Sequence, residues 1–561
     1  MTLPDAAEVL VIGAGPVGLS AAIQLGRAGV RTLVVERRDS LSRHPKALGI
    51  HARTMEIFRQ WGVADEIRAA GGGIDTVSIS WKTRFAGIEL GELEVGADPV
   101  EREQFAAYSP ESFCGCGQDL YEPILARVAC AHPSVTLQLG VEATGLRQDG
   151  RGASVTVRDA DGNTKTIRAD YVVAADGVRS PSRDWLGVTE TVEPAFGRSI
   201  NVRFRAPLEP YRSRRHLLLW VINAETQGAF VWQGRGDEWT YNFEAAPDRE
   251  IEYYDEARCA EILRAAIGVA DIPVAVHSIV NWRHEQAVAD RWRVGRVFIA
   301  GDAAHRFPPH GGFGMNSGVQ DGVNLAWKLI AALRWRAGEA LLDTYEVERR
   351  PVAQFNAEQC IINTRRMAET GWLLPDPVAL AAIERPEGAQ LRAGIGGAIP
   401  RQREQFFSHG QQFGAIYQSS AVIDDGAPPT HSSVAEYRPT AHPGARAPHV
   451  WLLDSAQRLL STIDLCDGGG FALFAGPRGT AWRAAGEATA RELHVPVHVH
   501  VIGGPELRER RGDPRWIERA EIDESGAILV RPDGNVAFRS RTLPAAPEQV
   551  LTDALQRILS R

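Results

Sequence analysis

A glycine-rich turn near the start of the chain constrains the fold more than any other feature. The apolar segment 8–12 leads into G-A-G-P-V-G at residues 13–18, and an Ala- and Leu-rich helical pattern follows up to residue 28. Residues 31–35 form a second apolar segment, which Glu36 closes. A strand, turn, helix and strand within about 30 residues is typical of a unit that binds a dinucleotide.

The residue types in this unit match the requirements of a dinucleotide. The first glycine permits the tight turn, the second lets a pyrophosphate approach the backbone, and the third lets helix and strand pack closely. The helix N-terminus presents free N–H groups to the phosphates, and the acid can bind ribose hydroxyls. An acid here argues against a 2′-phosphate, so we expect FAD or NAD and not NADP at this site. The predicted contacts are Gly13, Gly15, Pro16, Val17, Gly18, Glu36 and Arg37.

A second glycine- and proline-rich segment follows the apolar pattern at residues 296–300. It reads G-D-A-A-H-R-F-P-P-H-G-G-F-G-M-N over residues 301–316 and continues into a helical pattern that ends near residue 336. Asp302 follows the apolar pattern and can accept hydrogen bonds from a ligand, and the helix opened by Met315 and Asn316 can stabilise negative charge on that ligand. The sequence contains no second G-x-G-x-x-G unit, so we expect no separate NADPH domain.

With Asp176-Gly177 ahead of Arg179 and Ser180, these motifs resemble those of the group A FAD-dependent aromatic hydroxylases. This superfamily includes para-hydroxybenzoate hydroxylase, phenol hydroxylase and polyketide hydroxylases, and the resemblance covers residues 5–360. It implies bound FAD, with NADPH or NADH as a transient reductant. It also implies flavin contacts from Gln118, Asp176, Asp302, Pro309, Gly312, Gly314, Met315 and Asn316.

The reaction implied by the resemblance is hydroxylation of a phenolic or polyketide-type aromatic compound by O2, through a flavin C4a-hydroperoxide. The substrate must be activated as a phenolate, so a base or proton relay is expected. The candidates are His216, Tyr241, Arg283 and His284. Alternatives are an epoxidase or Baeyer–Villiger oxygenase acting on a polycyclic natural product, an FAD-dependent reductase without oxygen insertion, and a non-catalytic flavin-binding module.

Lysine is rare in this chain, with four Lys (Lys46, Lys82, Lys165 and Lys328) among 62 Lys and Arg residues. In the resembled family the segment after the second strand usually reads P-R-A-x-G, whereas residues 45–49 read P-K-A-L-G. Lysine is a compact point charge whose pKa falls on burial, unlike the guanidinium of Arg. We therefore predict that Lys46 faces the flavin cavity, both as a cofactor contact and as a catalytic candidate.

The expected fold class is α/β, with a Rossmann-like FAD-binding domain, a mostly antiparallel substrate domain and a C-terminal thioredoxin-like domain. We expect the FAD-binding domain at residues 1–75, 101–185 and 281–400, the last including a helical region, and the substrate domain at residues 76–100 and 186–280. A linker over 401–449 and the thioredoxin-like domain over 450–561 complete the chain. The sequence lacks C-x-x-C, so disulfide exchange is not expected.

The composition excludes several classes of partner. The formal net charge of −8 provides no basic excess for nucleic acid. No apolar run approaches the roughly 18–20 residues of a membrane span, and the N-terminus lacks the pattern of a signal peptide, so we expect a cytoplasmic protein. We predict no metal site. A homodimer is the expected assembly if the C-terminal domain mediates association.

Overall fold

The glycine-rich turn joins two strands of an eight-stranded sheet in the computed structural model, which describes residues 3–193, 197–212, 214, 216–374 and 376–561. β1 (Ala6–Ile12) pairs in parallel with β2 (Thr32–Glu36) and with β10 (Thr164–Ala174). β7 (Val135–Leu139) and β19 (Val297–Ile299) extend this parallel part at its two ends. Four consecutive residues of β1, Val9–Ile12, are buried, as expected for a strand covered on both faces.

Three helices pack beside the parallel strands. α1 (Pro16–Arg27) contacts both α5 (Gln118–Cys130) and α8 (Phe313–Arg334). The Leu19, Ile23 and Leu25 side chains of α1 are fully buried in the core that these helices share with the sheet. Their close packing fixes the N-termini of α1 and α8, which both face the cavity described below.

A second sheet has seven strands in the order β16-β12-β15-β14-β13-β4-β5. It combines β4 (Val77–Lys82) and β5 (Glu89–Val95) with β12 (Arg198–Arg205), β13 (Leu218–Ile222), β14 (Gln227–Trp232), β15 (Glu238–Glu244) and β16 (Ala275–Arg283). Only the β4–β13 pairing is parallel among these strands as described. One face buries an aromatic core together with α7 (Glu256–Ile267), and several side chains of the other face line the cavity.

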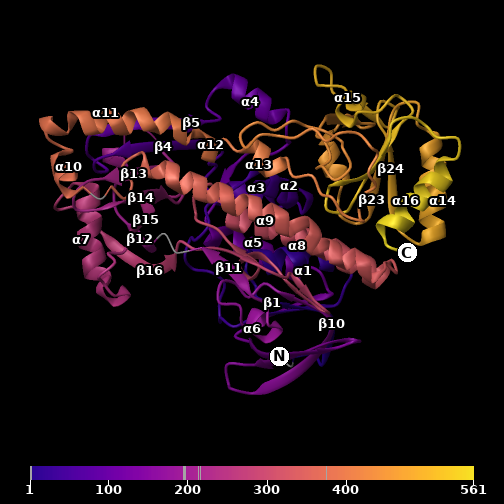
Figure 1. Ribbon diagram of the computed structural model, residues 1–561, viewed down its shortest axis with the longest axis horizontal. Coiled ribbons are helices and arrows are strands. Elements are labelled where there is room, and N and C mark those ends of the chain that lie inside the picture. Colours follow the sequence, from indigo (N-terminus) through magenta and orange to yellow (C-terminus); the bar gives the residue numbers. More distant parts are fainter. Residues whose placement is uncertain (1–2, 194–196, 213, 215, 375) are drawn as a thin grey trace.

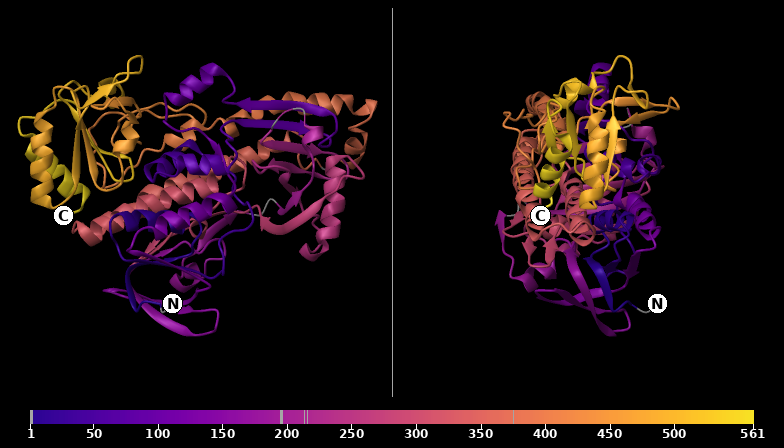
Figure 2. Two further views of the ribbon diagram at one scale, coloured as in Figure 1. Left: turned by 180° about the vertical axis from the view of Figure 1, so that it is seen from behind. Right: turned by 90° about the vertical axis from the view of Figure 1, so that its right-hand side faces the viewer.

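Two long helices connect the parts of the molecule. α8 and α9 (Glu339–Ala368) run across the middle of Figure 1, between the seven-stranded sheet at one end and the C-terminal strands at the other. The view from behind in Figure 2 shows the same order, with α10 (Pro377–Ala382) and α11 (Ala389–Ala398) beside the seven-stranded sheet. Over the residues described, neither these nor any other helix is long and apolar enough to cross a bilayer.

The C-terminal part is a small α/β unit. Its four-stranded sheet has the order β24 (Val497–Val501), β23 (Phe471–Ala475), β26 (Ala527–Val530) and β27 (Val536–Ser540). β23 and β24 are parallel and connected through α14 (Ala481–Leu493), and α16 (Pro547–Ile558) packs on α14. This arrangement agrees with the thioredoxin-like fold expected from the sequence. The thiol of Cys466 is buried and free.

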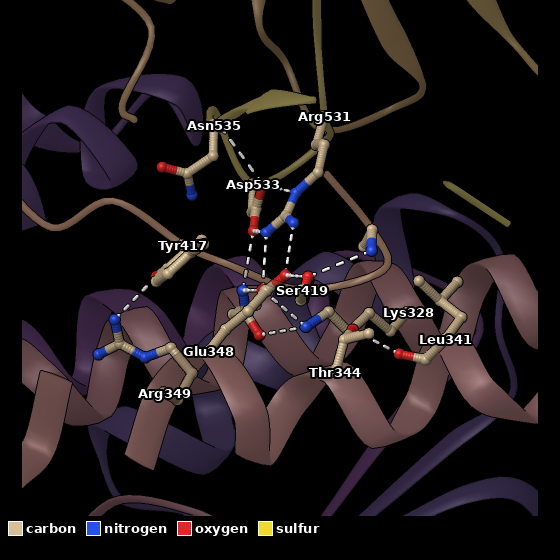
Figure 3. A network of polar contacts seen from close by, with 12 residues as sticks. Lys328, Leu341, Thr344, Glu348, Arg349, Tyr417, Ser419, Arg531, Asp533 and Asn535 are labelled. Atoms are coloured by element: carbon tan, nitrogen blue, oxygen red, sulfur yellow. Dashed lines mark hydrogen bonds and ion pairs between the residues drawn. The ribbon is translucent and has the colours of Figure 1, made fainter. Parts of the chain in front are cut away.

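A buried group of charged residues joins the C-terminal unit to the two long helices (Figure 3). Arg531, in the turn after β26, donates from Nη1 and Nη2 to the two carboxylate oxygens of Glu348 at 2.7 and 2.9 Å. Lys328 Nζ lies 2.8 Å from Glu348, and Arg531 also pairs with Asp533 at 2.5 Å. We call Lys328, Glu348, Arg531 and Asp533 the interface charge cluster; none of these side chains is more than 3% exposed.

The segment expected as a linker has more structure than its composition predicts. Residues 401–449 include the short helices α12 (Arg403–Phe406) and α13 (His409–Phe413), and residues 441–450 are all buried. Arg446 of this segment forms a buried ion pair with Glu56. The segment therefore packs between the other parts of the molecule instead of forming an exposed connection.

Candidate active site

A large cavity lies between the eight-stranded sheet, the N-terminus of α8 and the seven-stranded sheet. Its volume is about 1360 Å³. Pockets for one small molecule typically measure roughly 300–1,000 Å³, so this cavity has room for more than one ligand. Its wall includes the glycine-rich turn, the segment around Lys46, the 301–316 segment and one face of the seven-stranded sheet.

The three glycines of the first motif have distinct surroundings. Gly13 has a φ of +104°, and a Cβ there would lie 2.3 Å from the carbonyl oxygen of Ala175. A Cβ on Gly18 would lie 2.0 Å from the Gly13 carbonyl oxygen, whereas one on Gly15 would meet no atom within 4 Å. Gly13 and Gly18 are therefore needed by the chain's own packing, and Gly15 leaves space on the cavity wall.

The first turn of α1 adjoins this space. Pro16 and Val17 line the cavity, and Gly15 precedes the helix without a side chain that caps it. The free N–H groups of such a helix end form a site for an anion, because they combine hydrogen-bond donors with the positive end of the helix dipole. A pyrophosphate fits this position.

Three carboxylates face the cavity from the ends of strands. Glu36 is the last residue of β2, lines the cavity beside Arg37, and accepts hydrogen bonds from the backbone of Ala14 at 3.0 Å and of Arg38 at 3.1 Å. Asp176 accepts from the Ser182 backbone through Oδ2 at 3.1 Å, and its Oδ1 is buried without a partner in the described part of the chain. Such an unpaired buried oxygen calls for a ligand donor.

Asp302 is the third of these carboxylates, and it opens into the cavity. Burial within the molecule raises its pKa, although His305, Arg306 and Lys46 act in the opposite direction. A carboxyl that is exposed to the cavity but removed from bulk water gains most from a ligand that donates hydrogen bonds to it. The hydroxyls of a ribityl chain meet this requirement.

The second motif places a helix end against the same cavity. Pro309, Gly312, Gly314 and Met315 line it, and a Cβ on Gly314 would meet no atom within 4 Å. α8 begins after Gly312, which has a φ of +72° and supplies no side-chain cap. Free N–H groups therefore face the cavity here as well, where they suit negative charge on a flavin ring.

Asn316 has a different place from the one expected. Its side chain is buried within the protein, where Oδ1 accepts from the His51 backbone at 2.9 Å and Nδ2 donates to the carbonyls of Gly49 and Gly312 at 2.9 and 2.7 Å. It therefore joins the 49–51 segment to the start of α8. This side chain shapes the wall instead of lining it.

Lys46 and Gln118 lie on the wall between the two motifs. Burial lowers the pKa of Lys46, and Arg38 acts in the same direction, whereas Glu122, Asp302 and Glu36 act against it. Gln118, the first residue of α5, lines the cavity and donates a hydrogen bond to Glu122. The Lys46 side chain is thus exposed to the cavity beside the predicted flavin contacts.

The structure separates the candidates for the substrate base into two groups. His216 contacts Ser78 at 2.8 Å and Glu92 at 3.3 Å outside the cavity, and the fully buried Tyr241 hydroxyl bonds Thr226 at 2.9 Å within the core under the sheet. Arg283 and His284 both line the cavity. Burial raises the pKa of Tyr241, which further disfavours its ionised form.

The part of the cavity away from the glycine-rich turn is aromatic. The rings of Trp372, His310 and Trp220 form a cluster, with centroids 4.9 Å apart for Trp372 and His310, 5.9 Å for Trp372 and Trp220, and 6.2 Å for His310 and Trp220. These residues come from three separate segments, and the sequence offered no local signal for Trp372 or for His310 as a wall residue. The aromatic wall includes Phe105, Phe113, Trp220, Phe243, Trp282, His310, Trp372, Phe406, His409 and Phe413.

The comparisons with known proteins agree with this geometry. The family model "FAD binding domain" matches residues 6–359, and the model "Aromatic-ring hydroxylase, C-terminal" matches residues 440–561. Tetracenomycin A2 monooxygenase-dioxygenase of Streptomyces glaucescens is 35% identical over 99% of this chain and 97% of its own. 2,4-Dichlorophenol 6-monooxygenase of Cupriavidus pinatubonensis is 34% identical over 100% of this chain and 98% of its own.

A solved structure supports the same assignment. The flavin-dependent monooxygenase PieE, crystallised in complex with FAD and substrate, superposes with a TM-score of 0.91 at 34% identity, with 100% of both chains covered. The open space at Gly15 and Gly314, the two uncapped helix ends and the unpaired Asp176 oxygen all fit FAD. The chain therefore belongs to the family of FAD-dependent aromatic-ring monooxygenases.

Proposed function

We propose that this protein hydroxylates a phenolic aromatic compound, with O2 as the source of oxygen and NADPH or NADH as the electron donor. The observation that carries the proposal is the continuity of the cavity, which extends from the glycine-rich turn to the aromatic wall. A flat ring stacked on that wall would share the cavity with the cofactor. The names of the two relatives above, one acting on tetracenomycin A2 and one on 2,4-dichlorophenol, support an aromatic substrate.

Bound and reduced FAD supplies the chemistry that activates O2 and delivers one oxygen atom. In this proposal the N-terminus of α1 and Gly15 hold the pyrophosphate, and Glu36 binds the ribose. Asp302 accepts hydrogen bonds from the ribityl chain, and Asp176 accepts one near the phosphates. The N-terminus of α8 stabilises negative charge on the ring.

The remaining wall residues bind and orient the substrate. Lys46 holds a positive charge beside the ring, and the aromatic side chains exclude water from the space in which oxygen is transferred. The transient reductant, a homodimer and a cytoplasmic location stay predictions.

The test is turnover by the purified, FAD-loaded protein. NADPH and NADH oxidation is followed with phenol, 2,4-dichlorophenol and 1,8-dihydroxyanthraquinone as probes, and products are analysed by mass spectrometry under ¹⁸O2. We expect a product that gains one labelled oxygen atom. Substrate reduction without O2 consumption would support a reductase instead, and bound FAD without any NAD(P)H oxidation would support a binding module.

A further inference from the structure

Three polar residues form a compact group on the cavity wall of the seven-stranded sheet. His284 Nε2 lies 2.6 Å from Glu244 Oε1 and 2.6 Å from Ser199 Oγ. Ser199 Oγ also donates to Glu244 Oε1 at 2.6 Å. Ser199 and Glu244 are direct cross-strand partners on β12 and β15, and His284 follows β16. All three residues line the cavity.

The hydrogen bonds determine the tautomer of His284. Ser199 donates its single hydroxyl proton to Glu244, so its oxygen can only accept from His284, and the proton of a neutral imidazole is on Nε2, beside the Glu244 carboxylate. The other ring nitrogen, Nδ1, is then unprotonated and able to accept a proton. Nδ1 is buried and has no hydrogen-bond partner among the described residues. A buried nitrogen acceptor left unpaired on a cavity wall points to a donor supplied by a ligand.

The surroundings of the imidazole suit an aromatic hydroxyl compound. The His284 ring lies 4.2 Å from the Trp282 ring and 6.2 Å from the Trp372 ring, measured between centroids. Both indoles belong to the aromatic wall on which a substrate ring would stack. A hydroxyl on that ring is a donor of the type that Nδ1 lacks.

We propose that His284 is the base that ionises the substrate hydroxyl, with Glu244 as its positioning residue. The hydroxyl O–H bond breaks, its proton forms an N–H bond at Nδ1, and the electron pair stays on the oxygen as a phenolate. The imidazolium keeps its Nε2–H bond to Glu244, whose negative charge stabilises it. When the ring regains aromaticity, the C–H bond at the oxygenated carbon breaks and releases its proton to the medium, and the imidazolium returns its own proton to the original oxygen. This inference rests on the proposed function.

Other charged groups also face His284. Arg283 and Glu285 flank it and lie 3.8 Å from one another, and Arg306 contacts Glu285 at 3.4 Å. His310 lies on the cavity wall opposite, and its Nδ1 is 2.9 Å from the Thr364 hydroxyl. Burial lowers the pKa of His310 to about 3, so it stays neutral at pH 7. Glu244 is thus the carboxylate in direct contact with the His284 ring.

The molecule contains a matched control for this group. His216 also contacts a serine and a glutamate, with Nδ1 2.8 Å from Ser78 Oγ and Nε2 3.3 Å from Glu92 Oε1. It lies next to the same seven-stranded sheet but outside the cavity. His284→Gln and His216→Gln therefore remove the same functional group from similar polar surroundings, and only one of them affects the cavity.

The experiment uses the FAD-loaded full chain, with FAD content and thermal stability checked first. Hydroxylation is measured from pH 6 to 10 with the probe that the wild type oxygenates best. We expect His284→Gln to lower the rate at pH 7 about 100-fold or more, the usual contribution of a general base. The deficit should shrink as the pH rises and the probe ionises in solution, and His216→Gln should stay within about twofold of the wild type.

A binding measurement gives an independent readout. The absorption of bound 4-nitrophenol and bound 1,8-dihydroxyanthraquinone reports their ionisation without turnover. Wild type and His216→Gln should bind the ionised form at pH 7, and His284→Gln the neutral form. If His284→Gln does not retain FAD, Glu244→Gln is measured in the same way, and a fall in rate at pH 7 that shrinks as the pH rises is expected.

The outcomes separate the two proposals. A wild type that oxygenates no phenol overturns the proposed function. Wild-type oxygenation with an unchanged His284→Gln variant, or with a deficit that is equal at every pH, overturns only the role of His284 as a base.

Discussion

Two of the four lysines, the buried Lys328 and the cavity residue Lys46, differ in how completely their charges are partnered. Lys328, in the interface charge cluster, is 2.8 Å from Glu348 and 2.9 Å from Asn324 Oδ1. Lys46 lines the cavity, and no hydrogen bond to its ammonium group is found within the described ranges. Burial lowers the pKa of both, that of Lys328 to about 8.

The carboxylates show the same contrast more sharply. Burial alone would raise the pKa of Glu348, but Arg531 and Lys328 outweigh burial and hold that pKa below its ordinary value. Asp302 has no such partner, and its pKa is raised. Charges that are satisfied by the protein indicate structure, whereas charges left unpaired on a cavity wall indicate a ligand. Substitutions in each region test whether the paired charges stabilise the fold and the unpaired charges bind the cofactor.

The largest effect should follow from breaking the interface charge cluster. Arg531→Met leaves the buried carboxylates of Glu348 and Asp533 without their main partner. Breaking one side of a buried ion pair typically costs about 3–5 kcal/mol. We expect this loss in the free energy of unfolding, measured with urea.

The control is Arg478→Met, which removes an ion pair with Glu524 in the same C-terminal part. Arg478 is 80% exposed, and such a pair contributes about 0–1 kcal/mol at most. Equal effects of the two substitutions would contradict the assigned importance of the interface charge cluster.

The next largest effect concerns the cavity. Asp302→Ala removes a carboxylate that no protein group requires, so the apoprotein should keep its stability. A lost charge-assisted hydrogen bond costs about 1.5–3 kcal/mol, which corresponds to FAD binding weakened about 10- to 100-fold. Fluorescence titration with FAD measures this change, with the exposed-turn variant Asp161→Ala as the control. Undiminished FAD affinity would show that Asp302 is not a cofactor contact.

Acid should lower the free energy of unfolding through the buried carboxylates that are paired with cationic side chains. The pKa values of Glu56, Asp321 and Glu348 are lower in the folded protein than their ordinary values of 4.5, 3.8 and 4.5. Their stabilisation is therefore fully present well above pH 4.5 and is lost progressively as the pH falls from about 5 toward the lower pKa values of the folded protein. The raised pKa values of Asp302, Glu111 and Glu122 act in the opposite sense, whereas the lowered values of Glu8 and Glu190 add to the loss.

We expect the free energy of unfolding to fall by about 1–2 kcal/mol as the pH decreases from 5 to 4, measured with urea. The buried pairs should give nearly the same fall in 0.5 M salt, since salt screens mainly exposed charges. A fall that disappears in salt would assign the acid sensitivity to the surface.

The smallest effect should come from Lys46→Arg. The positive charge is retained, but a planar guanidinium replaces the compact ammonium group. FAD should therefore stay bound, while the rate of flavin reduction or the preference among phenols changes a few-fold. Stopped-flow reduction by NADPH or NADH measures the first, and competition between two phenols the second. No change in either would mean that Lys46 has no role at the cavity.

The sequence predicted those parts of the site whose residues are neighbours along the chain. Residues 13–18 and 301–316 carry their chemistry within one turn and one helix start, so their composition was sufficient. Asn316 was the exception, because its side chain has enough partners inside the protein to turn away from the cavity.

The substrate wall could not be predicted in the same way. Alternation along β15 shows that Tyr241 and Asn242 face opposite sides, but it does not show which side is the cavity. The proximity of His284, Glu244 and Ser199 depends on strand pairing between segments 45 and 85 residues apart. Lys328 and Arg531 both contact the Glu348 carboxylate. Tertiary packing alone brings these three residues together.

The order of the strands in the flavin sheet has a consequence for how this protein is made. β1 is synthesised first, but its neighbour β10 ends at Ala174, and β19 ends at Ile299. The α8 end of the cavity follows at residues 312–315, and the turn that completes the interface charge cluster lies at 531–533. The parallel strands of the flavin sheet therefore cannot all pair until residue 299 has been synthesised, and the interface charge cluster cannot form until residues 531–533 follow.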